Sequence, residues 1–211
     1  MLWEPGDRGG KVFFPQSGVV SICVPTRDGE CIEVASIGRE GAAGLNDGLL
    51  PAVTKAVIQA PGRFIGISAH PFAAAVHQSA ELARMAALCN GWLLLQAQQI
   101  AACNAVHPAD ARFCRWLLRA CDALGVEMIS VTQESIARAL GIRRTTVTLI
   151  AQQFQARGVI SYQRGKIDIH DRDALHAVAC DCYRGLGRAR WPSELLATGG
   201  ACCQSYHPAA G

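Results

Sequence analysis

Residues 132–158 read Thr132-Gln-Glu-Ser-Ile-Ala-Arg-Ala-Leu-Gly141-Ile-Arg-Arg-Thr-Thr-Val-Thr-Leu-Ile-Ala-Gln-Gln-Phe-Gln-Ala-Arg-Gly158. A short helix is expected to begin at Thr132, whose hydroxyl can accept hydrogen bonds from the free N–H groups of the first turn. Apolar residues recur at helical spacing along this helix, at Ile136, Ala137 and Leu140. Gly141 is expected to end it, because glycine adopts the positive φ of a tight corner at little cost.

A second helix is expected from about Arg143 to Arg157. Its inward face carries Val147, Ile150, Ala151 and Phe154. Two short helices joined at a glycine corner predict a helix-turn-helix. After Gly158 the residues alternate between apolar and polar and turn at Arg164-Gly165, which predicts a two-stranded wing beside the second helix.

The polar side of the second helix predicts contact with double-stranded DNA. The N-terminal part of a recognition helix reaches base edges, and arginine and threonine suit guanine and thymine there. The expected base-reading residues are Arg144, Thr145 and Thr148. The expected phosphate contacts are Thr132, Gln133, Arg143, Thr146, Arg164 and Lys166. The alternative is an ordinary helical pair with a solvated arginine face. The coincidence of corner, apolar face and wing favours DNA.

The charge distribution agrees with this interpretation. Residues 1–107 hold 7 Lys+Arg against 8 Asp+Glu, a net charge of −1, and residues 108–211 hold 13 against 9, a net charge of +4. The positive half is the one that would meet phosphate. Neither a signal peptide nor a run of 18 apolar residues is recognised, so we expect a cytoplasmic protein without a membrane partner.

Residues 132–183 resemble the C-terminal winged helix of the Crp/Fnr family of bacterial transcription regulators. The likeness continues upstream through Ala101-Ala-Cys103-Asn104-Ala-Val-His107 and Arg115-Trp116-Leu117-Leu118 to about Lys11. The resemblance implies an α+β fold: a cyclic-nucleotide-binding-type β jelly roll, a long dimerisation helix and a C-terminal winged helix-turn-helix. It also implies a homodimer on a palindromic operator, RNA polymerase as a further partner, and a sensor domain shortened at its N-terminus.

We expect four segments. Residues 1–79 form the β-roll domain, 80–106 the dimerisation helix, 107–184 the DNA-binding domain and 185–211 a disordered tail, with His107-Pro108 as the boundary before the DNA-binding domain. Within the first segment, strands are expected near 12–14, 18–24, 31–35, 54–59 and 63–67, with a hairpin turn at 26–30. Short strands separated by turn residues are typical of a sandwich or barrel.

The long helix is apolar over more than half its circumference, so it needs two partners. The stripe expected to form the dimer seam is Leu82, Met85, Cys89, Trp92, Gln96, Gln99 and Cys103, and an adjoining stripe is Leu88, Leu95 and Ala102. The alternative is a helix buried within a monomer, because Gln96 and Gln99 interrupt the seam.

An effector pocket is expected at the β-roll, around Glu40, Gly41, Thr54 and Lys55, by alignment with the family's nucleotide loop. A cyclic nucleotide is disfavoured, because the family's phosphate-binding arginine is replaced here and lysine lacks its forked geometry. Another small effector and a ligand-free scaffold both remain open, so no cofactor is assigned.

The ten cysteines form no C-x2-C pair, and we predict no metal site. His70, His77 and His107 are not spaced as ligands either. A redox- or metal-responsive regulator using Cys180 and Cys182 is the alternative function. An enzyme on the β-domain is disfavoured and no catalytic residues are assigned, because residues 12–67 contain no histidine. Arg112 and Arg115 are expected to contact phosphate or to form exposed salt bridges.

Overall fold

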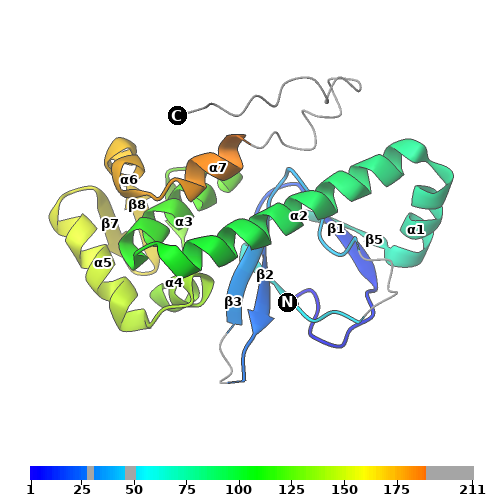
Figure 1. Ribbon diagram of the computed structural model, residues 1–211, viewed down its shortest axis with the longest axis horizontal. Helices are drawn as coiled ribbons and strands as arrows, with labels where there is room; N and C mark the ends of the chain where they lie inside the picture. Colours follow the sequence, from blue (N-terminus) through cyan, green and yellow to red (C-terminus); the bar gives the residue numbers. More distant parts are fainter. Residues whose placement is uncertain (28–30, 46–50, 189–211) are drawn as a thin grey trace.

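The computed structural model describes residues 1–27, 31–45 and 51–188. Figure 1 shows one long helix, α2, crossing the molecule, with a small β-domain against its middle and a helical domain at its C-terminal end. The predicted α+β architecture is therefore confirmed. None of the described helices is both long and apolar enough to cross a membrane.

The β-domain consists of two small antiparallel sheets. One sheet pairs β1 (Lys11–Pro15) with β5 (Phe64–Ser68), and the other has the order β3 (Cys31–Ile37), β2 (Val19–Pro25), β4 (Lys55–Ala60). All five predicted strands are present within a few residues of their expected bounds. The predicted hairpin turn falls partly on 28–30, outside the described residues, although β2 and β3 do pair antiparallel. The core of this domain is formed by Val20, Ile22, Ala35, Ile37, Ala43 and Ala56.

Two helices follow the β-domain, α1 (Ala69–Gln78) and α2 (Ala80–Val106). Ser79 caps α2 by accepting a hydrogen bond from the backbone N–H of Leu82 at 3.3 Å. With 27 residues, α2 is about 40 Å long at about 1.5 Å per residue. It packs on β3 along its middle and on α7 near its C-terminal end.

The C-terminal domain packs helices around a three-stranded sheet of order β6-β8-β7. Its elements are α3 (Ala109–Leu124), β6 (Met128–Ser130), α4 (Gln133–Leu140), α5 (Arg144–Ala156), β7 (Ile160–Gln163), β8 (Lys166–Ile169), α6 (Arg172–Val178) and α7 (Cys182–Arg188). The four residues predicted to face inward from α5 are all buried. The tail prediction is wrong at its start, because α7 continues through Arg188; residues 189–211 lie outside the described part.

The structure corrects the seam predicted on α2. Trp92, Gln96 and Cys103 are buried against the chain's own domains. The Gln96 side chain bonds both backbone groups of Ser36, accepting from its N–H at 3.2 Å and donating to its carbonyl at 3.1 Å. It also accepts from Arg119 Nη2 at 2.7 Å. Gln96, which interrupts the apolar stripe, therefore ties α2 to the β-domain, whereas Gln99 and Cys103 of the same stripe contact Cys182 and Cys180 of the C-terminal domain.

Candidate nucleic-acid interface

The helix-turn-helix corner forms where the sequence predicted it. Thr132 Oγ1 accepts a hydrogen bond from the Ser135 N–H at 3.1 Å and so caps α4. Gly141 has φ 61° and ψ 40°, the left-handed conformation that turns the chain toward α5. Ala137 is buried at the crossing.

The first turns of α5 present an exposed polar surface. Arg143, Arg144 and Thr145 are exposed, and the first turn contains no acid and has no side-chain cap. Its free N–H groups and the helix dipole therefore favour a phosphate. Thr148 is half-buried and donates to Gln133 Oε1 at 2.8 Å, which fixes both side chains beside each other. Thr146 is also half-buried.

The wing turns at the two residues predicted for it. Arg164 and Gly165 both have positive φ, 49° and 75°, as the tight turn of a two-residue hairpin requires. Arg164 and Lys166 are exposed at this tip. The wing is held to the domain by Tyr162, whose hydroxyl donates to the Val131 carbonyl at 3.2 Å.

Sequence reasoning missed Leu149 and misplaced two arginines. Leu149 is 61% exposed on α5, one turn beyond Thr145, where an apolar side chain can contact a thymine methyl. The sequence could have indicated Leu149, because it is an apolar residue that does not fall on the inward-facing stripe of this helix. Arg112 and Arg115 are buried, so neither contacts phosphate nor forms an exposed salt bridge. Arg112 Nη1 donates to Asn104 Oδ1 at 2.9 Å and to the Leu140 carbonyl at 3.1 Å.

A buried carboxylate that sequence reasoning did not single out joins the two domains. Glu33 on β3 is 5% exposed and accepts hydrogen bonds from Ser21 Oγ at 2.6 Å and Gln59 Nε2 at 3.0 Å. It also accepts from Trp116 Nε1 on α3 at 3.2 Å. Burial raises the pKa of the Glu33 carboxyl, against the Ser21 hydrogen bond and the Arg119 charge, which lower it.

The predicted effector residues are not brought together. A cavity of about 780 Å³ lies between the β-domain and α2, and Thr54 lines it, as do Arg8 and Lys11, which sequence reasoning missed. Glu40 and Gly41 instead border a separate small hollow. Glu40 accepts from the Gly38 N–H at 2.7 Å and so closes its own loop. Lys55 pairs with Glu4 at 2.9 Å.

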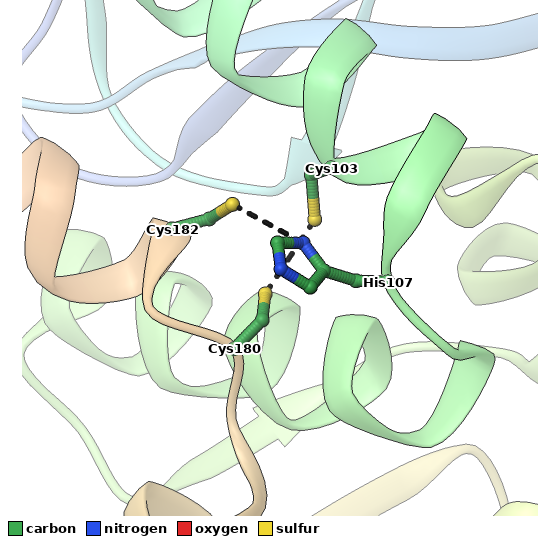
Figure 2. Close-up of side chains that lie close together, drawn as sticks. All are labelled: Cys103, His107, Cys180 and Cys182. Carbon is green, nitrogen blue, oxygen red and sulfur yellow. Dashed lines mark hydrogen bonds between the residues drawn. The ribbon is translucent and has the colours of Figure 1, made fainter.

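The cysteines singled out in the sequence lie in an unexpected group. Cys180 and Cys182 meet Cys103 and His107, with the four potential ligand atoms all within 4.8 Å of one another (Figure 2). Spacing along the chain did not reveal that His107 lies beside these three cysteines. The sequence pattern that could have indicated this group was Cys103 and His107, four residues apart at a helix end, together with the closely spaced Cys180 and Cys182. Burial, followed by the hydrogen bond with Cys103, raises the pKa of the Cys180 thiol to about 12.

These features define a class: a winged helix-turn-helix DNA-binding domain joined by a long helix to a small β-domain. A family model described as the Crp-like helix-turn-helix domain matches residues 111–178, which span α3 through the end of α6. No curated protein sequence matches the chain.

Solved structures share the fold of most of this chain. A CRP/FNR-family transcriptional regulator from Thermus thermophilus is 19% identical, with a TM-score of 0.70 over 85% of this chain and 93% of that one. FixK2 from Bradyrhizobium japonicum is 20% identical, with a TM-score of 0.70 over 84% and 89%. The c-di-GMP-responsive regulator CLP from Xanthomonas campestris is 17% identical, with a TM-score of 0.66 over 80% and 88%.

The chain therefore has a Crp-like helix-turn-helix DNA-binding domain and the fold of the Crp/Fnr transcription regulators, as the resemblance predicted.

Proposed function

We propose that the chain is a sequence-specific transcription regulator that binds a palindromic operator as a homodimer. The observation that carries the proposal is the exposed, acid-free start of α5 beside a wing with two exposed cations. The residues that contact base edges are Arg144, Thr145, Thr148 and also Leu149. The phosphate contacts are Thr132, Gln133, Arg143, Thr146, Arg164 and Lys166.

The dimer forms through the stripe of α2 that the chain leaves uncovered. Positions on this stripe repeat by four and three residues, as in a coiled-coil seam. They are Leu88, Gly91, Leu95, Gln98, Ala102 and Ala105, all exposed except half-buried Leu88. Two copies joined here present two recognition helices, and half-sites about 34–36 Å apart follow from that symmetry.

The remaining parts of the proposal concern the other domain and partners. Residues 1–79 act as the sensor domain, 80–106 as the dimerisation helix, and 107–184 together with the rest of α7 as the DNA-binding domain. A small effector fits the β-domain cavity, whose lining includes the cations Arg8 and Lys11 together with Asp7. RNA polymerase is the further partner that the resemblance implies.

Footprinting on genomic fragments tests the DNA contacts. We expect a protected palindrome at physiological salt, and Arg144→Ala should weaken it by about 1–3 kcal/mol at one base pair per half-site while relaxing specificity there. Arg63→Ala is the matched control, because Arg63 is an exposed arginine of the β-domain. The control should leave the footprint and its affinity unchanged.

Two results would contradict the assignment. Equal weakening of Arg144→Ala on specific and random DNA would make Arg144 a phosphate contact instead of a base contact. Weak binding with a steep salt dependence and no protected site, with or without small-molecule extracts, would remove sequence-specific regulation altogether.

A further inference from the structure

Four side chains from two distant parts of the chain converge at the end of α2. We call Cys103, His107, Cys180 and Cys182 the Cys3His cluster. Cys103 Sγ lies 3.5 Å from Cys180 Sγ, and His107 Nδ1 lies 3.4 Å from Cys182 Sγ. In Figure 2 the three sulfur atoms and the imidazole ring point into one common space. The three cysteines are buried, and His107 is half-buried.

These distances match the edges of a ligand tetrahedron. Zinc binds thiolate sulfur at about 2.3 Å and imidazole nitrogen at about 2.0 Å, so tetrahedral angles separate two sulfurs by about 3.8 Å and a sulfur from a nitrogen by about 3.5 Å. All ligand atoms of the cluster lie within 4.8 Å of one another, so small side-chain movements close the remaining edges. Three cysteines and one histidine are also a closed structural zinc set.

Local structure explains why the four residues meet. Cys103 and His107 are four residues apart at the end of α2, so their side chains share one face. Cys180 lies in the turn between α6 and α7, and Cys182 is the first residue of α7, which packs on α2. Neither pair alone completes a site, because each supplies two ligands.

The surroundings of the cluster suit a bound dication. Gln99, one turn before Cys103, donates its Nε2 to Cys182 Sγ at 2.9 Å, the kind of outer contact that orients a thiolate ligand.

We propose that the Cys3His cluster binds one zinc ion, which clamps α7 and the α6–α7 turn to the end of the dimerisation helix. Metal binding stands independently of the proposed function, whereas its effect on DNA binding rests on that function. The clamp joins the DNA-binding domain to α2, so zinc sets the orientation of the recognition helices and hence operator affinity.

The test measures metal binding by the whole, fully reduced protein under anaerobic conditions. We expect one equivalent of Zn²⁺ per chain, and Co²⁺ in its place should give thiolate-to-metal charge-transfer bands with the intense visible bands of tetrahedral cobalt. Cys180→Ser and His107→Gln should each weaken binding by more than about 100-fold, since loss of an outer partner alone costs about 10–100-fold. Gln99→Ala should fall in that outer-partner range.

Cys89→Ser is the matched control, because Cys89 is a half-buried cysteine of the same helix outside the cluster. It should bind zinc and cobalt like the unaltered chain. The cobalt spectrum of the unaltered chain decides the ligand set even where a variant fails to fold. Footprints with and without a chelator then test whether zinc changes operator affinity. If the chain does not bind DNA at all, only this claim about operator affinity is lost, and zinc binding is still tested by the metal measurements.

Three outcomes would overturn the proposal. The first is substoichiometric metal in the reduced protein, and the second is a cobalt spectrum without thiolate bands. The third is a Cys103–Cys180 disulfide in the purified protein with no metal binding after reduction. That last result would assign the cluster to thiol redox chemistry.

Discussion

Glu33→Gln isolates the effect of burying a carboxyl group between the two domains. Glu33 is 5% exposed and holds three hydrogen bonds, one of them from Trp116 across the domain boundary. Glutamine is nearly isosteric: its oxygen can still accept from Trp116, and the Ser21 hydroxyl and the Gln59 amide can reorient toward its NH₂ group. The substitution therefore removes the titrating proton while keeping the network.

The direction of the effect follows from the raised pKa of Glu33. The native chain binds this proton more tightly than the unfolded chain does. Stability is therefore greatest below the ordinary carboxyl pKa of about 4.3 and falls as pH rises from there to the raised native value. Inside that window one extra bound proton gives a slope of about 1.4 kcal/mol per pH unit. Glu33→Gln should lack this slope, so its stability relative to the unaltered chain should increase with pH.

Urea denaturation at half-unit steps from pH 4.5 to 7 measures this difference. Glu81→Gln is the control, because Glu81 is an exposed acid on α2. A free-energy difference between Glu33→Gln and the unaltered chain that stays constant with pH would refute the reasoning. A difference that shrinks as pH rises would show that the Arg119 charge and hydrogen bonds outweigh burial.

Two further substitutions test the α2 seam and the glycine corner. Leu95→Glu places a charge at a seam position that is 47% exposed in the single chain, and it should weaken the dimer by at least about 100-fold. Sedimentation measures the dissociation constant, with Leu94→Glu as the control, because Leu94 is exposed beside the seam. Equal weakening by both substitutions would mean that the seam lies elsewhere on α2. Gly141→Ala should lower the free energy of unfolding, measured by urea denaturation, by about 1–2 kcal/mol, because alanine is strained at the φ of 61°. Steric crowding adds little, since the new Cβ would lie at an ordinary contact distance of 3.5 Å from Ile32. An unchanged stability would mean that the backbone at this corner relaxes readily.

The helix-turn-helix could be predicted almost residue by residue because its signals are local. A capping hydroxyl, a glycine with positive φ and an apolar period of 3.6 each act within one or two turns of chain. The same holds for the wing, whose turn at Arg164 and Gly165 is fixed by backbone conformation. No long-range contact is needed to recognise these elements.

The parts that sequence reasoning got wrong depend on contacts between distant segments. Gln96 reads as a defect in an apolar seam, yet it bonds Ser36, 60 residues away. The sequence suggests that Arg112 is a surface cation, but its side chain bonds Asn104 on α2 and the Leu140 carbonyl on α4. The Cys3His cluster joins Cys103 and His107, four residues apart, to Cys180 and Cys182, and only the packing of α7 on α2 brings the two pairs together.

The joint between α2 and α3 is stiffer than the sequence suggests. His107-Pro108 looks like a boundary that could bend, but Arg112 bonds Asn104 on one side of it and Leu140 on the other. Bending there would leave a buried guanidinium without its acceptors, which costs more than an exposed salt bridge could return. A zinc ion in the Cys3His cluster would add a second tie across the same boundary. In the proposed regulator, a signal from the β-domain cavity would cross to the recognition helix through the contacts of β3 with α4 and through the hydrogen bond between Glu33 on β3 and Trp116 on α3.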